Sequence, residues 1–474
     1  MNEQSPLAGA VAVGEAAGAL RRKLRGQVLL PGEPGYEGAR SLWNAMIDRR
    51  PAVILRCRGV ADVIDAVKLA AALRLPLAIR AGAHNVAGLA IADDAVMVDL
   101  SLMRGVRVDP QARVAQVEGG ATWGDVDRET QAFGLATPGG LISDTGVAGL
   151  TLAGGIGWLR SRHGLCIDNL LAADVVTADG RLVHANAEQN ADLFWALRGG
   201  GGNFGVVVRF EFRLHPIAPR LAFAAPIYPL TAGSSPIRFW RDFLADKHGD
   251  VASLVEFSTI PEGPDFPQAD WGKRVYTVAA VHAGDPDEGE RLLRPLREQG
   301  ELVADLSAQL PYCELQKLFD GVAPAGTRRA YWKSHFLSTL PDALIEQGLA
   351  AAAENPSEHS LSSFWNFGGA TARVPADATA LGDRSMGWMY SIDTMWTDPA
   401  DDARNIAWTR RQWDATRRWS QDGRLYLNFL GAGEADDRVV RDSYGKTFQR
   451  LAAIKAKYDP GNLFRINHNI RPAA

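Results

Sequence analysis

The sequence contains few cysteines, no long apolar run and no block of like charge. Its three cysteines, Cys57, Cys166 and Cys313, lie far apart and form no CxxC pair. This spacing argues against a disulfide framework and against a zinc site, so we expect no metal. No stretch approaches the roughly 18 apolar residues of a membrane span, and the start of the chain is acidic or neutral before its basic residues, the reverse of a secretory signal. We therefore expect a cytoplasmic protein with no membrane partner.

No dense run of Lys or Arg occurs, and the formal net charge is only -4. The chain therefore lacks the electrostatic footprint that binding to a phosphate backbone requires, and we expect no nucleic-acid partner. The motif GxxxxGK followed by Ser or Thr is also absent, which counts against an ATP-binding protein with a P-loop. Glycine, in contrast, is abundant, with 48 residues among 474. A chain of this length is long enough for two cores, such as a cofactor domain beside a substrate domain.

A regular pattern of strands and helices begins at residue 51. Short apolar or alternating runs predict strands at residues 51–57, 76–82, 95–101, 104–110, 112–120 and 205–216. The amphipathic stretch 61–75 predicts a helix, and Thr122 with Asp125 three residues later resembles a capping box that opens another. The pair Asp179-Gly180 predicts a two-residue hairpin turn. This order is α+β, not strict βαβ repetition.

The composition changes after Pro216, where proline becomes frequent and glycine-rich turns become rarer. We therefore place a domain boundary near residue 217. Strands are predicted beyond it at residues 273–284, 362–370 and 385–396, and their aromatic, alternating character suits a sheet with one face lining a cavity. The segment 458–472 is unusually polar for a chain terminus.

The loop RAGAHNVAG, residues 80–88, directly follows a predicted strand. Its small residues allow successive backbone N–H groups to point at phosphate oxygens. An isolated histidine such as His84 would ordinarily be a surface loop residue. Its surroundings change this interpretation, because their spacing resembles that around the flavin-bearing histidine of the vanillyl-alcohol-oxidase superfamily. The matching positions are Pro51, Asp62, Val63, Val67, Leu77 and the cluster from Gly82 to His84.

Three further motifs carry the same resemblance. Residues 137–171 are similar to the second flavin-contacting loop of the superfamily, while residues 192–212 and 458–470 are similar to its berberine-bridge-enzyme-like branch. The resemblance spans roughly residues 27–472, and it is strongest to bacterial FAD-linked oxidases of the 6-hydroxy-D-nicotine-oxidase type. The run GGGNFG, residues 200–205, also satisfies GxGxxG. It follows a predicted helix and precedes a strand, however, the reverse of a Rossmann site.

The resemblance implies an α+β, two-domain PCMH-type FAD-binding fold. Residues 1–217, with a core of about 47–217, would form the FAD-binding domain, and residues 218–423 a substrate domain built on an antiparallel sheet covered by helices. Residues 424–474 would return to the FAD domain. The implied cofactor is FAD, joined covalently to His84. The cofactor-binding residues that the resemblance implies are Arg80, Ala81, Gly82, Ala83, His84, Asn85, Gly88, Thr145, Gly146, Gly149, Gly154, Gly155, Gly157, Val207, Asn467 and Asn469.

Two departures from the family pattern affect the attachment. Several relatives also bind flavin through a cysteine, and that position falls on Gly146 here, so we expect no second link and interpret Cys166 as a small buried thiol. A Gly146→Cys variant would be a way to create one. Ala81 and Ala83 stand where the family usually has glycine. If either needs a positive φ, strain of ~1 kcal/mol or more could make the attachment slower or incomplete.

The implied activity is that of an oxidase or dehydrogenase that takes hydride from a small amine, alcohol or natural-product intermediate. Molecular oxygen would reoxidise the flavin and give hydrogen peroxide. A sugar oxidase, an oxidative cyclase and a flavoprotein with structural FAD stay open as alternatives. Phe429 stands where the family's sugar and alcohol oxidases usually carry tyrosine, and the loss of that candidate base favours an amine or a cyclisation substrate.

The candidate catalytic residues lie in the middle and C-terminal parts of the chain. They are Asn428, Tyr426, Lys333 and Asp393, with Asn366 and Tyr390 as further pocket candidates. All lie in segments that we expect to face the flavin ring. We expect a monomer or a homodimer whose partners are a small-molecule substrate and molecular oxygen.

Overall fold

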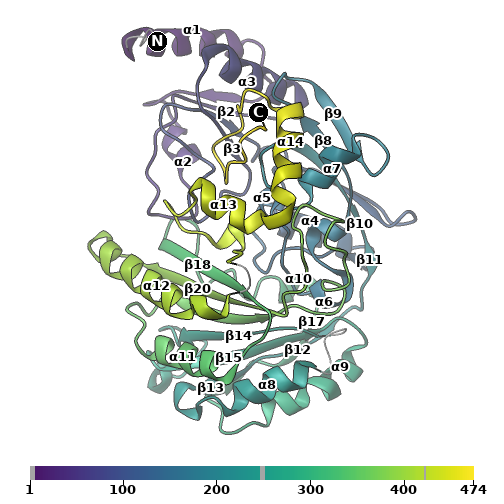
Figure 1. Ribbon diagram of the computed structural model, residues 1–474, viewed down its shortest axis with the longest axis vertical. Helices are drawn as coiled ribbons and strands as arrows, with labels where there is room; N and C mark the ends of the chain where they lie inside the picture. The colour runs from purple at the N-terminus through teal and green to yellow at the C-terminus, as the bar shows by residue number, and fades with distance from the viewer. Residues whose placement is uncertain (1–5, 246–250, 421–422, 474) are drawn as a thin grey trace.

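The computed structural model describes residues 6–245, 251–420 and 423–473. A four-stranded and a five-stranded sheet lie at one end of the molecule, and a nine-stranded sheet lies at the other (Figure 1). The predicted α+β class is confirmed. None of the described helices combines the length and the apolar character that crossing a membrane requires.

The two N-terminal sheets contain the strands that the sequence predicted from residue 51 onward, together with a strand at residues 27–29 that it did not predict. The four-stranded sheet contains β1 (Gln27–Leu29), β2 (Val53–Arg56), β4 (Val96–Asp99) and β3 (Leu77–Arg80), in that spatial order. The five-stranded antiparallel sheet contains β5 (Val106–Asp109), β6 (Val114–Glu118), β10 (Val206–Arg213), β8 (Leu170–Val176) and β9 (Leu182–Asn186). A short ribbon pairs β7 (Leu135–Ala136) with β11 (His215–Pro216). In the first sheet β2, β4 and β3 are parallel, which explains why β4 is an uninterrupted buried run.

The nine-stranded sheet is antiparallel throughout. Along its main path it contains β16 (Ala304–Asp305), β13 (Pro226–Pro229), β15 (Arg274–His282), β14 (Val251–Thr259), β19 (Leu361–Asn366), β20 (Trp388–Trp396) and β18 (Arg329–Leu337). Two more strands, β12 (Leu221–Ala224) and β17 (Ala308–Leu310), extend it beside β15. The strands predicted at residues 273–284, 362–370 and 385–396 are therefore confirmed as β15, β19 and β20.

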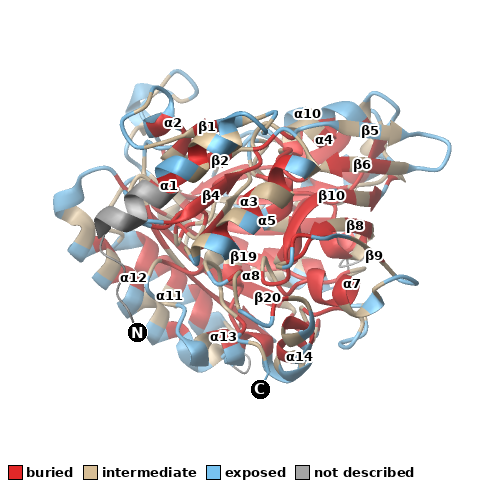
Figure 2. Ribbon diagram, turned by 90° about the horizontal axis from the view of Figure 1, so that it is seen from above, coloured by how far each residue is buried: buried red, intermediate tan, exposed pale blue. Residues whose placement is uncertain are grey.

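Helices cover the outer faces of these sheets, and the buried residues concentrate beneath them (Figure 2). The N-terminal half contains α1 (Pro6–Arg21), α2 (Tyr36–Arg40), α3 (Val60–Leu73), α4 (Trp123–Gln131), α5 (Val147–Leu152), α6 (Arg160–His163) and α7 (Ala191–Leu197). The remainder contains α8 (Ser235–Ala245), α9 (Pro286–Leu293), α10 (Tyr312–Leu315), α11 (Asp342–Ala353), α12 (Asp402–Thr416), α13 (Asp437–Tyr444) and α14 (Phe448–Tyr458). The predicted capping box is present at α4, where the side chains of Thr122 and Asp125 accept reciprocal backbone hydrogen bonds.

The predicted two-residue hairpin turn is wrong in its length. The hairpin itself exists between β8 and β9, but the last strand pair is Val176 with Leu182. Thr177 closes the loop by donating its N–H to the Arg181 carbonyl, and Gly180 adopts a positive φ of 74°. The glycine therefore supplies the left-handed residue of a longer loop instead of the second residue of a tight turn.

The large sheet has two faces with different neighbours. Because strand side chains alternate, Val255, Phe364 and Tyr390 share one face, and they belong to an apolar cluster that includes residues of α8, α11 and α12. Leu254, Trp365 and Met389 share the opposite face, which belongs to a different cluster. This opposite face looks towards the N-terminal half of the molecule.

The C-terminal segment packs against the five-stranded sheet. Residues from Leu425 to Ile470 share one apolar cluster with β6, β8 and β10, and α13 and α14 lie beside this half of the molecule in Figure 1. The expected boundary near residue 217 falls between β11 and β12. The division into residues 1–217, 218–423 and 424–474 stays a prediction, and residues 1–5, 246–250, 421–422 and 474 of those ranges lie outside the described residues.

A buried ion pair fixes α14 in this position. Lys455 and Asp459 are both fully buried, with 2.7 Å between Nζ and Oδ2. Lys455 also donates to the carbonyl oxygens of Asn203 and Phe464. It thus connects α14 both to the loop before β10 and to the C-terminal segment.

Replacing Lys455 should therefore destabilise the fold strongly. Lys455→Met leaves the Asp459 carboxylate buried and without its cation, and we expect a loss of about 3–5 kcal/mol in the free energy of unfolding. Lys457→Met is the matched control, because its pair with Asp192 is at the surface and we expect a loss below about 1 kcal/mol. Urea unfolding followed by tryptophan fluorescence measures both. Equal effects of the two variants would contradict this account of α14.

Candidate active site

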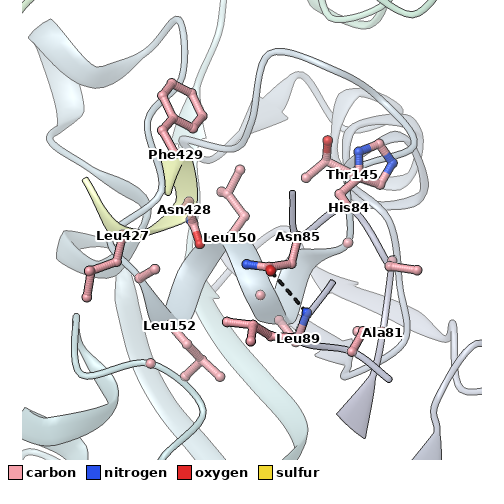
Figure 3. Close-up of a pocket in the computed structure, with 18 of the residues that line it drawn as sticks. Ala81, His84, Asn85, Leu89, Thr145, Leu150, Leu152, Leu427, Asn428 and Phe429 are labelled. Atoms are coloured by element: carbon pink, nitrogen blue, oxygen red, sulfur yellow. Dashed lines mark hydrogen bonds between the residues drawn. The ribbon is translucent and has the colours of Figure 1, made fainter. Parts of the chain in front are cut away.

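A cavity of about 350 Å³ lies between the N-terminal half and the inner face of the large sheet. Its first wall is formed by the loop after β3 and by the loop that leads into α5. Its second wall is the large sheet, through Leu254, Glu256, Trp332, Leu361, Trp365, Asp393 and Met395. The C-terminal segment contributes the short 3-10 helix Leu427–Phe429 and residues 466–468. Figure 3 shows His84 and Thr145 on one side of this space, with Leu427, Asn428 and Phe429 on the opposite side.

Most of the predicted cofactor residues line this cavity. They are Ala81, Gly82, Ala83, His84, Asn85, Thr145, Gly146, Gly149, Val207 and Asn467. These residues come from four separate segments of the chain, which the fold brings together around one space.

Six of the predicted cofactor residues do not line the cavity. For three of them, Arg80, Gly155 and Gly157, the structure shows a different role. Arg80 points away from it, towards the Asp99 carboxylate at 3.5 Å and the Ala39 carbonyl. Gly155 and Gly157 instead allow close packing within their own loop. A Cβ on Gly157 would lie 2.1 Å from the Gly139 carbonyl oxygen, and one on Gly155 would lie 2.2 Å from the Cβ of Cys166. The remaining three, which are also outside the lining, are Gly88, Gly154 and Asn469.

Gly82 and Gly146 hold the two loops of the first wall together. A Cβ on Gly146 would lie 2.4 Å from the backbone nitrogen of Gly82, and a Cβ on Gly82 would lie 2.2 Å from that of Gly146. Neither backbone can move away easily, because Gly146 also pairs with Thr122. A side chain at residue 146 would therefore require the two loops to move apart. A second flavin link through Gly146→Cys stays a prediction that this backbone does not favour.

His84 is held by an aromatic ring and a carboxylate. Its imidazole stacks on Trp43, with ring centroids 5.7 Å apart, and its Nε2 lies 3.0 Å from Oδ1 of Asp144. Burial acts to raise the pKa of Asp144, but the hydrogen bond and the charge of His84 hold that pKa below its usual value. Ala83, directly before His84, has a φ of +61°. Of the two alanines in this loop, Ala83 is thus the one that carries the anticipated strain.

Cys166 is fully buried and is not among the residues that line the cavity. Its Sγ lies 3.2 Å from the hydroxyl of Thr151, and burial raises the pKa of its thiol. A thiol that is protonated and enclosed by protein is a poor nucleophile.

The sheet brings Asp393 to the cavity but turns Lys333 away. Asp393 pairs with Trp332 across the strands, and both face the cavity. Lys333 is one residue further along and points to the opposite face, where its ammonium lies 4.0 Å from the Trp413 ring and binds Glu434. The expectation that Lys333 faces the flavin is therefore wrong, and Tyr390 is wrong for the same reason of alternation.

The side chain of Asn366 also forms hydrogen bonds outside the cavity. Its amide oxygen accepts hydrogen bonds from the backbone N–H of Ser253 and from the guanidinium of Arg160. Asn366 therefore does not face the cavity either.

Asp393 is an unusual carboxylate. It is 7% exposed, it accepts one hydrogen bond from the Ser391 hydroxyl at 3.0 Å, and its Oδ1 has no partner among the described residues. Burial raises the pKa of Asp393 to about 7. A carboxyl group with such a pKa is half ionised near neutral pH, which suits a general acid or base.

Tyr426 and Asn428 form a polar pair at the edge of the cavity. The Asn428 amide donates to the Tyr426 hydroxyl at 3.0 Å. Burial raises the pKa of Tyr426 to about 12. Its hydroxyl therefore stays protonated at neutral pH and can orient a ligand by a hydrogen bond. Because it keeps its proton, it cannot act as the base.

Sequence reasoning missed three polar residues of this site. Asp144 lies within the loop that was predicted, and its position directly before Thr145 was a usable signal. His468 lies between Asn467 and Asn469, and it lines the cavity where Asn469 does not. Glu256 lies in a strand that the sequence did not predict, so no signal pointed to it. No group of three or more His, Cys, Asp or Glu side chains in the described part of the chain could hold a metal ion.

The cavity fits a flat cofactor with polar edges. Its first wall is backbone from small residues, which allows a ring or a pyrophosphate to approach closely. The amide of Asn467 donates to the carbonyls of Gly202 and Phe464, while its Oδ1 has no partner among the described residues. An unpartnered amide oxygen can accept a hydrogen bond from a ring N–H, such as the one that the flavin ring carries.

Comparison with known proteins agrees with this geometry. The FAD binding domain family matches residues 51–186, and the berberine and berberine-like family matches residues 425–471. FAD-linked oxidoreductase pgmH from Aspergillus terreus is 30% identical over 485 residues, covering 96% of this chain and 95% of the relative. (R)-6-hydroxynicotine oxidase from Paenarthrobacter nicotinovorans is 28% identical over 466 residues, covering 95% and 97%. The crystal structure of 6-hydroxy-D-nicotine oxidase from Arthrobacter nicotinovorans is similar with a TM-score of 0.82 at 28% identity, covering 95% and 99%.

Fold and cavity together define an FAD-dependent oxidoreductase with the PCMH-type FAD-binding fold. The chain belongs to the FAD-linked oxidoreductases, in the berberine-bridge-enzyme-like branch of the vanillyl-alcohol-oxidase superfamily. The predicted family, fold class and enzyme class are therefore confirmed, and FAD is the cofactor.

Because Gly82 and Gly146 are in close contact, we expect one added methyl group at residue 146 to reduce both the stability and the FAD content of the protein. Gly146→Ala forces the two loops apart, and we expect it to cost about 1–3 kcal/mol of stability and to lower the FAD content of the purified protein. Gly38→Ala is the control, because a Cβ on Gly38 in α2 would meet nothing within 4 Å. Absorbance of the flavin relative to protein, together with the midpoint of thermal unfolding, measures both effects. A Gly146→Ala protein with normal FAD content and normal stability would refute the close contact.

Proposed function

We propose that this enzyme oxidises a small organic molecule, with FAD bonded covalently to His84 and molecular oxygen as the electron acceptor. The observation that carries the proposal is that His84 and Asp393 line one cavity from different walls, the first on the flavin-binding loop and the second on the large sheet. A candidate attachment point and a candidate base thus share one space. We further propose that the enzyme is cytoplasmic and works as a monomer or a homodimer.

The surroundings of His84 support its role in attachment. A neutral imidazole nitrogen is nucleophilic near neutral pH. Trp43 fixes the plane of the ring, and Asp144 binds one of its two nitrogens. Such a contact fixes which nitrogen carries the proton, so that the other nitrogen keeps the lone pair. No second link through cysteine is proposed, because Cys166 is buried outside the cavity.

FAD, when bound, supplies the redox chemistry: it accepts a hydride from the substrate and passes the electrons to oxygen, which yields hydrogen peroxide. The side chains of this protein transfer the proton, orient the substrate and exclude water. Asp393 holds or accepts the proton of the substrate's N–H or O–H group. The Tyr426 hydroxyl and the Asn428 amide offer hydrogen bonds that orient the substrate. Trp332, Trp365 and Phe429 surround these groups and exclude water.

Phe429 bears on the substrate. Its ring packs edge-on against Trp332 at 5.3 Å and Tyr426 at 5.1 Å, so the position is apolar and offers no proton acceptor. Asp393 is then the available base on the cavity face. An amine needs only to lose a proton from its ammonium form, whereas an alcohol requires a stronger base. An amine is therefore the substrate class that we favour.

The covalent link is tested by a single substitution. We expect His84→Ala to yield protein whose flavin separates on acid precipitation, while the flavin of the unmodified enzyme stays with the pellet. Cys166→Ser is the control, and we expect it to retain the flavin because the thiol lies outside the cavity. Fluorescence of the supernatant and the pellet quantifies the distribution. Covalent flavin in the His84→Ala protein would disprove the assignment.

The role of Asp393 predicts a specific pH profile. A base must be ionised, so kcat/KM should rise with pH up to about 7, the raised pKa of Asp393, and level off above it. Among the other groups in the cavity, burial lowers the pKa of His468 to about 4 and raises that of Tyr426 to about 12, far from this range. Burial and then the charge of Asp393 raise the pKa of Glu256 to about 8. A second inflection near pH 8 in the pH profile of kcat/KM would therefore be assigned to Glu256.

Asp393→Asn should abolish the rise of kcat/KM with pH that ends near pH 7, and it should lower kcat about 10²–10⁴-fold. The variant is isosteric, so it preserves the hydrogen bond from Ser391. Peroxide release with the best substrate from a screen of amines, alcohols and sugars measures the rate. Flavin absorbance in the same preparation reports whether the cofactor is retained. An unchanged pH limb in Asp393→Asn would show that another group is the base.

A further inference from the structure

The large sheet presents a second carboxylate to the cavity, Glu256 in β14. Glu256 is opposite Ser363 of β19, and Ser363 is opposite Ser391 of β20. Asp393 is two residues beyond Ser391, so it lies on the same face of the sheet as Glu256. The two carboxylates are thus separated by two strand spacings of roughly 4.8 Å each and by one step of two residues along the strand. Between them lies space that a small group of a ligand can occupy.

Neither carboxylate has a cationic partner among the residues that the structure describes. The lining of the cavity contains no Lys or Arg among the described residues. Two buried cations near this wall are engaged elsewhere: Lys333 binds Glu434 on the opposite face of the sheet, and Arg160, which lies over the Trp365 ring, donates to the carbonyl oxygens of Asn366 and Ser253. Apart from carboxylates, the sheet wall of the cavity is formed by the apolar side chains of Leu254, Trp332, Leu361, Trp365 and Met395.

This arrangement is costly unless a ligand satisfies it. The side chain of Glu256 makes no hydrogen bond to any described residue, and the Oδ1 atom of Asp393, which is more than nine-tenths buried, is likewise without a partner among them. For Asp393, removal from water without a full set of partners costs several kcal/mol, while Glu256 stays partly exposed but lies near the charge of Asp393. A proton lowers this cost in the free enzyme, and the raised pKa of Glu256, about 8, agrees with that. A cation bound between the two groups would replace the proton.

We propose that Glu256 determines substrate specificity by binding the charged nitrogen of a protonated amine, together with Asp393. The remainder of such a substrate packs against the aromatic and aliphatic side chains of the sheet wall. A ligand carboxylate is repelled by two groups of like charge, and a neutral alcohol gains hydrogen bonds but no charge attraction. Glu256 is a binding residue in this assignment, whereas Asp393 alone is the base. The inference rests on the proposed function for the location of the reaction, but it concerns binding and not turnover.

Three probes of nearly equal shape test the proposal. Benzylamine, benzyl alcohol and benzoate differ mainly in charge, and isothermal titration calorimetry of the holoenzyme under nitrogen measures their binding without turnover by oxygen. We expect benzylamine to bind at least about tenfold more tightly than benzyl alcohol, and benzoate to bind more weakly than both. Equal affinity for the amine and the alcohol, or tighter binding of benzoate, would overturn the proposal with the unmodified enzyme alone.

Glu256→Gln then assigns the selectivity to this residue. We expect it to weaken benzylamine binding about tenfold and to change benzyl alcohol binding less than about twofold. Glu354→Gln, at the exposed end of α11, is the matched control and should leave both affinities unchanged. Equal weakening of both probes, or no change in either, would refute the role of Glu256. Failure of the proposed function has a different signature, because absent covalent flavin or absent peroxide release is measured separately and leaves these affinities interpretable.

Discussion

The contact between Gly82 and Gly146 is the constraint on which the site depends. It joins the loop that carries His84 to the loop that carries Asp144 and Thr145, and it does so through backbone atoms at distances that exclude any side chain. The pairing of Gly146 with Thr122 and the capping box at α4 extend this connection into the five-stranded sheet. The loops are therefore rigid through backbone contacts. Rigidity of this kind lets Ala83 keep a left-handed conformation that an alanine in a free loop would avoid.

The second constraint is the alternation of side chains in the large sheet. It assigns each residue of β14, β18, β19 and β20 either to the helix-covered face or to the cavity, with no intermediate choice. Asp393 and Lys333 illustrate the consequence. Asp393 belongs to β20 and Lys333 to the neighbouring edge strand β18, and both are almost completely buried, yet the first lines the cavity and the second binds Glu434 on the far side. A shift of one residue in register would exchange their roles.

These two constraints explain how much the sequence could predict. The strands between residues 53 and 118, the helix at residues 60–73 and the loop with His84 carry local signals, namely apolar runs and clustered small residues, and their secondary structure was predicted correctly. The face on which Lys333, Tyr390 or Asn366 would lie depends on the register of a sheet whose strands are far apart in the chain, and no local pattern encodes it. Glu256 was missed because β14 alternates weakly. Gly155 and Gly157 were assigned to FAD because a glycine required for packing and one required for a ligand look identical in sequence.

A cavity that has two carboxylates and, among the described residues, no lining Lys or Arg does not favour the stability of the fold. Replacing Glu256 and Asp393 with apolar residues of similar size would remove two groups that resist desolvation, and buried charges are often replaced in this way without loss of stability. Their presence in an otherwise apolar wall is therefore better explained by the ligand than by the fold. The two groups also divide the work. Asp393, which accepts a hydrogen bond from Ser391, is the group that accepts the substrate's proton in the proposed reaction. Glu256, whose pKa is raised by burial and by the charge of Asp393, exchanges its own proton for the cation. Two carboxyl groups on one face can thus bind a charged nitrogen and still leave one base for the reaction.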